Sequence, residues 1–201
     1  MKIIGLCGGS GSGKTSVARS FSKYNVPTID ADIIYKEITS YNSDCMKALV
    51  SAFGDSVQNQ DGSLNRSKMR EIAFVAADSK ENLTKLNSIT HSFVLSEIDK
   101  RIGEYALSGF EAVIADVPLM FESEFNKKCD FLIAVTSDEE TRISRILLRD
   151  KISREQAKAR IAHQIDNSEL INKVDYVIEN NGDLASLEAK IDEVYKMIFN
   201  K

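Results

Sequence analysis

Five short apolar runs recur along the chain, and segments of helical periodicity separate them. The runs are Ile3 to Cys7, Val26 to Ile29, Ala112 to Ala115, Phe131 to Val135 and Tyr176 to Ile178. Strands that alternate with helices usually form a parallel sheet that helices cover. The pattern therefore predicts an α/β fold.

Polar residues mark the expected starts of two helices late in the chain. Ser137 to Glu140 and Ser153 to Gln156 both have the form of a capping box, so two helices are predicted within residues 138–166. Apolar residues at near-helical spacing predict a last helix: Leu184, Leu187, Ile191, Val194 and Ile198. It should pack one face onto the sheet.

The stretch from about residue 33 to residue 110 is far longer than one crossover helix requires, and its pattern is mostly helical. No Gly/Ser linker, repeat or low-complexity tract divides the chain. We therefore expect residues 1–201 to form a single domain with this stretch as an insertion. Its helices could roof an acceptor site or add core packing, and the pattern favours neither.

Composition narrows the class of protein. With 201 residues, 43% hydrophobic and 28% charged, the chain can bury a substantial core. A net charge of -4 provides no general attraction to nucleic acid or an anionic membrane, so we expect neither as a partner. Three cysteines without C-x-x-C spacing, and no signal-peptide pattern, fit a cytoplasmic protein. Composition makes no prediction of oligomeric state.

A glycine-rich segment follows the first predicted strand directly. Gly8 to Thr15 reads Gly-Gly-Ser-Gly-Ser-Gly-Lys-Thr, which satisfies G-x-x-x-x-G-K-[ST]. Glycines let backbone N–H groups curl around phosphate oxygens, while the helix that follows directs its positive end at the same anion. The predicted nucleotide-binding residues are Gly9, Ser10, Gly11, Ser12, Gly13, Lys14, Thr15 and Ser16. Lys14 would hold the β- and γ-phosphates of ATP, and the Thr15 hydroxyl would ligate Mg²⁺.

Other classes of nucleotide-binding protein match the chain less well. Lys14 stands where a dinucleotide fingerprint needs its last glycine. No aspartate is followed three positions later by glycine, and Asn126 to Asp130 fails the guanine-reading N-K-x-D pattern. These mismatches disfavour a hydride-transfer enzyme and a GTPase switch. A nucleoside monophosphate kinase, or an ATPase acting through a protein partner, stays as an alternative to a small-molecule kinase.

Three sets of charged residues are candidates for chemistry. Asp30 and Asp32 follow the second strand, where a ligand crevice is expected; we assign Asp32 as base and Asp30 as helix cap or support, although both could merely cap. Asp116 ends the third strand and is a second candidate Mg²⁺ ligand. Arg142, Arg145 and Arg149 share a helix face that suits phosphoryl charge, or that is simply solvated.

Several segments together resemble the dephospho-CoA kinase family, whose members phosphorylate the ribose 3′-hydroxyl of dephospho-CoA. The segments are Gly5 to Thr15, Ile29 to Asp32, Asp61 to Arg66, Ile89 to His91, Asp116 to Glu122 and Val177 to Gly182. The D-A-D and D-x-P-L-x-F-E segments in this order are more selective than the glycine-rich loop, and the match spans most of the chain.

The resemblance implies a three-layer α/β/α fold with a five-stranded parallel sheet of the P-loop nucleoside-monophosphate-kinase type. Residues 33–110 would be the helical acceptor-binding insertion, and residues 138–166 an arginine-bearing lid. Asp32 matches the family's general base, Lys14 its loop lysine, and Arg145 and Arg149 its lid arginines. Asn180 to Gly182 would lie near the adenine. The implied substrates are ATP, with Mg²⁺, and dephospho-CoA.

Overall fold

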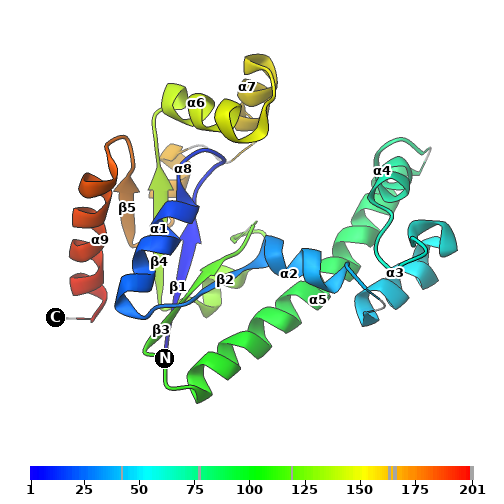
Figure 1. Ribbon diagram of the computed structural model, residues 1–201, viewed down its shortest axis with the longest axis horizontal. Coiled ribbons are helices and arrows are strands. Elements are labelled where there is room, and N and C mark those ends of the chain that lie inside the picture. Colours follow the sequence, from blue (N-terminus) through cyan, green and yellow to red (C-terminus); the bar gives the residue numbers. More distant parts are fainter. Residues whose placement is uncertain (42, 77, 119, 163, 165–166, 200–201) are drawn as a thin grey trace. The chain divides into compact units, whose positions relative to one another are not determined.

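The computed structural model describes residues 1–41, 43–76, 78–118, 120–162, 164 and 167–199. The chain forms two compact units (Figure 1). The first contains Met1–Ile29 and Tyr105–Lys201, and the second contains Asp30–Glu104. No described helix carries an apolar run that could cross a lipid bilayer.

A five-stranded sheet lies at the centre of the first unit, in the order β2-β3-β1-β4-β5. The strands are β1 (Lys2–Cys7), β2 (Thr28–Asp30), β3 (Ala112–Asp116), β4 (Phe131–Thr136) and β5 (Tyr176–Glu179). Leu6 of β1 pairs with Asp116 on one side and Ile133 on the other, both in parallel register. The carboxyl ends of β1, β3 and β4 therefore meet at one edge of the sheet, where the glycine-rich loop begins.

The helices of the first unit are α1 (Lys14–Phe21), α6 (Glu139–Asp150), α7 (Arg154–Ala162), α8 (Asn167–Ile171) and α9 (Leu184–Phe199). Short 3-10 turns η1 (Ser22–Tyr24) and η3 (Phe125–Lys128) complete it. Apolar residues of α1 and α9, including Phe21 and Ile191, join Ile4 and Ile133 of the sheet in one buried core. Helices cover both faces of the sheet, so the predicted three-layer α/β/α fold is confirmed.

The structure bears on three predictions made for the helix ends. The Ser153 capping box is confirmed, because the Ser153 N–H donates to Gln156 Oε1 at 3.0 Å and the Gln156 N–H to Ser153 Oγ at 3.3 Å. The Ser137 capping box is wrong: α6 has Asp138 as its N-cap without a side-chain bond, and the Ser137 hydroxyl is used elsewhere. Leu184 begins α9 but is 62% exposed, so it does not share the buried face.

The second unit is helical and has its own core. It contains α2 (Ala31–Ile38), α3 (Asp44–Phe53), the 3-10 turn η2 (Asp55–Val57), α4 (Arg66–Phe74) and most of α5 (Ser79–Leu107). Its apolar cluster is built from Cys45, Met46, Leu49, Val57, Leu64, Met69, Ala73 and Leu86. The second unit therefore buries an apolar core of its own.

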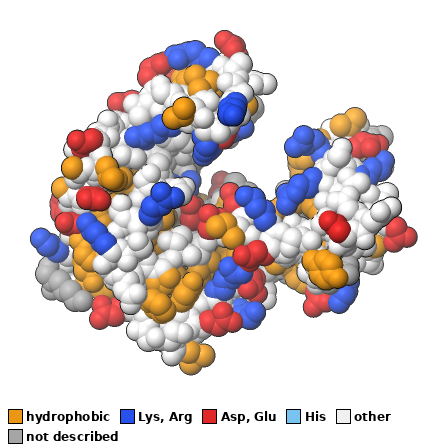
Figure 2. Space-filling view, viewed as in Figure 1, with side chains coloured by type: hydrophobic (Ala, Val, Ile, Leu, Met, Phe, Trp, Pro, Cys, Tyr) orange, Lys and Arg blue, Asp and Glu red, His pale blue; other side chains and the backbone are white. Residues whose placement is uncertain are grey.

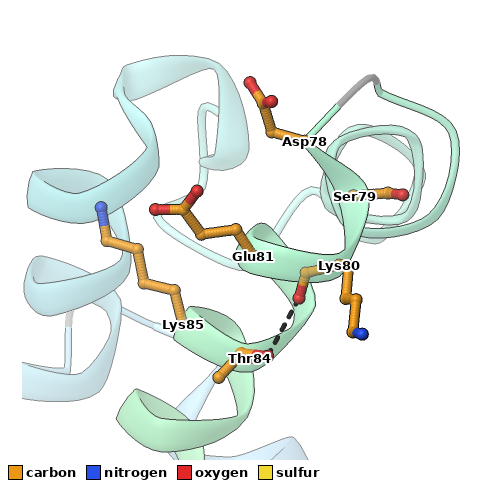
Figure 3. A pocket seen from close by; sticks show the side chains of 6 residues that line it. All are labelled: Asp78, Ser79, Lys80, Glu81, Thr84 and Lys85. Atoms are coloured by element: carbon orange, nitrogen blue, oxygen red, sulfur yellow. Dashed lines mark hydrogen bonds between the residues drawn. The ribbon is translucent and has the colours of Figure 1, made fainter.

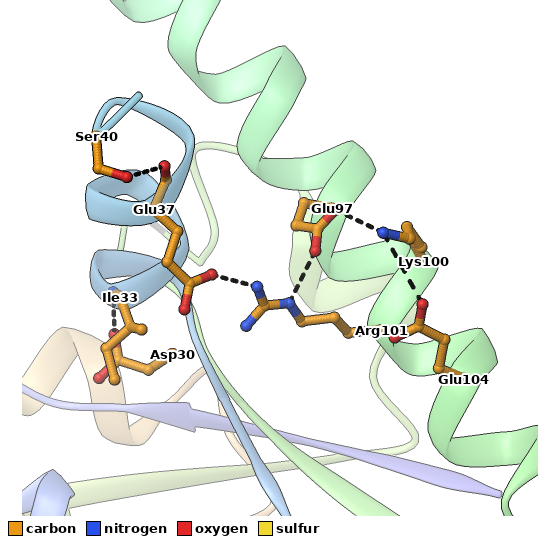
Figure 4. Close-up of polar contacts among 8 residues, drawn as sticks. All are labelled: Asp30, Ile33, Glu37, Ser40, Glu97, Lys100, Arg101 and Glu104. Carbon is orange, nitrogen blue, oxygen red and sulfur yellow. Dashed lines mark hydrogen bonds and ion pairs between the residues drawn. The ribbon is translucent and has the colours of Figure 1, made fainter. Parts of the chain in front are cut away.

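Charged side chains join α2 to α5 within the second unit (Figure 4). The Arg101 guanidinium lies between Glu37 of α2, to which Nη2 donates, and Glu97 of α5, whose Oε1 accepts from Nε at 3.0 Å. Lys100 adds looser pairs to Glu97 at 3.5 Å and Glu104 at 3.9 Å. Arg101 thereby ties α2, the helix that carries Asp32, to the long helix beside it.

Candidate phosphate-binding site

The loop from Gly8 to Gly13 connects β1 to α1. Gly8, Gly11 and Gly13 have φ angles of 144°, 79° and 98°, which residues with a Cβ rarely adopt. Gly13 is the N-cap of α1 and supplies no side chain to cap it. The Ser16 and Val17 N–H groups donate to the Gly13 carbonyl at 2.9 and 3.2 Å, while no capping side chain serves the N–H groups of Lys14 and Thr15. An anion is the acceptor that the helix dipole favours at this position.

Lys14 is the first residue of α1, and its Nζ donates to the carbonyl oxygen of Gly8 at 2.8 Å. The ammonium group thus lies over the loop. Thr15 and Ser16 follow on the exposed side of the first helical turn. This is where the motif predicted a phosphate cation and a metal-binding hydroxyl.

The three arginines of α6 all contact this loop. Arg142 Nε donates to the Ser10 carbonyl at 3.0 Å, and Arg145 Nη1 donates to the Gly11 and Ser12 carbonyls, each at 3.2 Å. Arg149 Nη2 donates to Ser10 Oγ at 3.2 Å. Arg142 is only 6% exposed, which contradicts the alternative of a fully solvated helix face.

Arg149 is also held by a neighbouring carboxylate. Its Nε and Nη2 donate to the two oxygens of Asp150 at 2.7 and 2.9 Å, and Arg160 of α7 donates to the same carboxylate. These bonds lower the pKa of Asp150 to about 2 and raise the pKa of Arg149. On the face shown in Figure 2, both charge signs gather over α6 and α7.

Gln164, which follows α7, was not among the predicted site residues. Its Oε1 accepts from the Ser10 N–H at 2.9 Å and from Arg142 Nη2 at 2.6 Å. A Cβ on Gly9 would lie 2.6 Å from this oxygen and 2.2 Å from Arg142 Nη2, so the loop backbone packs closely against both. A lone glutamine after a helix carries no sequence signal for such a contact.

Asn180, at the end of β5, closes the other side of the loop. Its buried side chain donates from Nδ2 to the Ser12 carbonyl at 2.8 Å, and its own carbonyl accepts from Arg145 Nη2 at 3.0 Å. The Ser137 hydroxyl lies 2.7 Å from that carbonyl and 2.8 Å from Asn181 Oδ1. Gly182 is exposed, and a Cβ there would lie 3.2 Å from Ser186 Cβ of α9.

Asp116 lies at the end of β3, opposite Leu6 of β1. The pKa of the buried thiol of Cys7, the next residue of β1, depends on the charges around it. This pKa is raised to about 12, first by burial and then by Cys129 and the charge of Asp116, whereas the charge of Lys14 lowers it. Asp116 and Lys14 thus both lie near the end of β1.

Asp30 and Asp32 belong to the second unit by contact, and the structure separates their roles. Asp30 is the N-cap of α2, because its Oδ1 accepts from the N–H groups of Asp32 and Ile33 at 2.8 and 3.1 Å. Its assignment as a cap is confirmed. The Asp32 side chain is exposed on the first turn of α2 and takes no part in this cap.

A hollow of about 620 Å³ lies beside the first turns of α5 (Figure 3). It is lined by Asp78, Ser79, Lys80, Glu81, Thr84 and Lys85. Two of these side chains are bonded to nearby backbone, Thr84 Oγ1 to the Lys80 carbonyl and Lys85 Nζ to the Ala52 carbonyl, both at 2.9 Å. It shares no residue with the glycine-rich loop.

Comparison with known proteins agrees with this geometry. A family model described as dephospho-CoA kinase matches residues 2–186. A relative from Fusobacterium nucleatum subsp. nucleatum, named dephospho-CoA kinase, is 39% identical over 196 residues, which cover 98% of each chain. The chain belongs to the dephospho-CoA kinase family. It is therefore a phosphotransferase of the kinase class, and ATP is its implied phosphoryl donor.

Solved structures support the fold of this dephospho-CoA kinase family member. A Thermus thermophilus protein aligns with a TM-score of 0.77 at 27% identity, over 98% of this chain and 97% of the other. A dephospho-CoA kinase from Campylobacter jejuni aligns with a TM-score of 0.66 at 23% identity, over the same shares. Both matches support the fold described above.

Proposed function

We propose that the chain transfers the γ-phosphoryl group of Mg·ATP to the ribose 3′-hydroxyl of dephospho-CoA, giving CoA and ADP. The observation that carries the proposal is the loop from Gly8 to Thr15 with Lys14 and three arginines bonded to it, in a chain of this family. Such a cationic cradle suits the charge that develops on a transferring phosphoryl group.

In this proposal the loop and lid hold the donor. The loop amides and Lys14 bind the phosphates, while Arg145 and Arg149 neutralise the equatorial oxygens of the transferring group. Asn180 and Gly182 face the adenine of ATP. Residues 138–166 act as a lid that closes over the phosphates and excludes water, since an open site would hydrolyse ATP.

The residues present fit a Mg²⁺ ion. Thr15 offers an exposed hydroxyl and Asp116 a carboxylate, which are the oxygen donors that Mg²⁺ prefers. Among the described residues, no group of three or more His, Cys, Asp or Glu side chains could hold a metal alone, so phosphate oxygens and water would complete the shell. When bound, the ion would offset negative charge on the phosphates.

Asp32 would supply the base. Its exposed carboxylate, distinct from the capping carboxylate of Asp30, orients the acceptor hydroxyl and accepts its proton. The helical insertion, residues 33–110, would bind the rest of dephospho-CoA. We also propose that the protein is cytoplasmic and that its substrates are small molecules.

A panel of acceptors tests the function. ADP release would be measured with Mg·ATP and either dephospho-CoA, a nucleoside monophosphate or no acceptor. Of the two acceptors, only dephospho-CoA should raise ADP release well above the acceptor-free rate. Release with only the monophosphate would overturn the acceptor assignment.

Asp32→Asn should cut turnover strongly with little loss of ATP affinity, and unchanged turnover would remove Asp32 from the mechanism.

A further inference from the structure

The side-chain oxygen of Gln164 occupies an unusual position on the phosphate loop. It accepts one hydrogen bond from a loop amide, the Ser10 N–H at 2.9 Å, and one from a guanidinium, Arg142 Nη2 at 2.6 Å. Backbone amides of a P-loop and arginine guanidinium groups both bind phosphate oxygens. Gln164 Oε1 therefore sits where the donors for an anion converge.

Arg142 lacks the partner that a buried guanidinium usually has. It is 6% exposed, and within the described residues its hydrogen bonds go to neutral acceptors, the Ser10 carbonyl and Gln164, with no ion pair to a carboxylate. Burial lowers the pKa of Arg142. Buried charges are normally paired, so an anion arriving at the loop would complete this arginine's surroundings.

We propose that Gln164 is a displaceable latch on the glycine-rich loop: its side-chain oxygen accepts hydrogen bonds from Ser10 and Arg142 where a phosphate oxygen would accept them, and the triphosphate of ATP replaces it there. This makes Arg142 a phosphate-binding residue in addition to Arg145 and Arg149. The inference rests on the proposed function for the identity of the nucleotide alone, because it needs ATP binding and no acceptor.

The latch has two energetic consequences. In the free protein it satisfies the Ser10 N–H and Arg142 Nη2, and that stabilisation is lost when ATP enters, which weakens ATP binding. A negative charge at position 164 would pair with Arg142 more strongly than the neutral amide does, and would also repel the phosphates. The two substitutions Gln164→Ala and Gln164→Glu should therefore shift ATP affinity in opposite directions.

The test is the dissociation constant of ATP without any acceptor, measured by titration calorimetry and compared with that of AMP. We expect Gln164→Ala to bind ATP about two- to tenfold more tightly and Gln164→Glu to bind it at least about tenfold more weakly. AMP lacks the β- and γ-phosphates, so its affinity should stay within about twofold in both variants.

The matched control is Asn172→Ala, which removes an exposed side-chain amide outside residues 138–166, where Asn172 Nδ2 donates to the Ser168 carbonyl at 2.9 Å. It should leave the affinity for ATP unchanged. Unchanged or weaker ATP binding by Gln164→Ala would overturn the latch, since Gln164 would then be neutral or a brace for bound nucleotide. Equal shifts for ATP and AMP would also overturn it. Failure of the wild-type chain to bind ATP would instead refute the proposed function.

Discussion

Gly13→Ala perturbs the loop at one backbone position with two separable costs. The φ angle of Gly13 is 98°, and forcing a residue with a Cβ into such a conformation costs about 1–2 kcal/mol. The new Cβ would lie 2.1 Å from Asn180 Nδ2, so the Asn180 side chain must move. Its buried 2.8 Å bond to the Ser12 carbonyl would then be lost, at about 1–2 kcal/mol. We expect a total loss of about 2–4 kcal/mol.

A double-mutant cycle with Asn180→Ala separates these costs. Asn180→Ala alone removes the same hydrogen bond, and in the double variant the Cβ of residue 13 no longer meets an amide. The loss in the double variant should therefore be smaller than the sum of the two single losses, by about 1–2 kcal/mol. The assay is urea unfolding of all four proteins, with ATP affinity measured in parallel.

Gly103→Ala is the matched control. Gly103 lies within α5, its Cβ would meet nothing within 4 Å, and its φ is not positive. Alanine should stabilise this helix by about 1 kcal/mol. Strictly additive losses at positions 13 and 180 would refute the clash, and a Gly13→Ala variant as stable as wild type would refute both costs.

Three further predictions follow from individual groups. Asp150→Asn should destabilise the protein above pH 4, and the difference in unfolding free energy between the two proteins should shrink as the pH falls from about 4 to about 2, because the pKa of Asp150 lies near 2 in the folded state against an ordinary 3.8. Acid unfolding of both proteins measures this difference, and a difference that stays constant with pH would contradict the prediction. Cys7, 6% exposed with a pKa near 12, should resist iodoacetamide at pH 8 until the protein unfolds, and labelling of the native protein, located by peptide mass, would contradict its burial. Ser12→Ala should raise the melting temperature by an amount that corresponds to about 1 kcal/mol of unfolding free energy, because the Ser12 hydroxyl is buried without a hydrogen-bond partner among the described residues. A lower melting temperature would show that the hydroxyl is bonded.

The strands were predictable because central parallel strands are buried on both faces and therefore appear as continuous apolar runs. The observed strands begin and end within two residues of the predicted ones; β2, for example, spans Thr28–Asp30 where Val26 to Ile29 was expected. The glycine-rich loop was equally predictable, because its spacing follows from local backbone geometry. Asp30 as a cap belongs to the same local class.

Tertiary partners account for what the pattern missed. Ser137 has the sequence of a capping residue, but Asn180 and Asn181 compete for its hydroxyl from more than forty residues further along the chain. The spacing of the arginines places them on one face of α6. That this face points toward the glycine-rich loop depends on how α6 packs, which the spacing does not give. Gln164 is a tertiary contact of the same kind.

Identification of the product tests the central claim most directly. The chain would be incubated with Mg·ATP and dephospho-CoA, and the acceptor analysed by mass spectrometry and ³¹P NMR. We predict a gain of one phosphoryl group as a 3′-phosphomonoester, formed one-for-one with ADP and abolished in Lys14→Ala. ADP formed without any phosphorylated dephospho-CoA, or an unchanged rate in Lys14→Ala, would contradict the account.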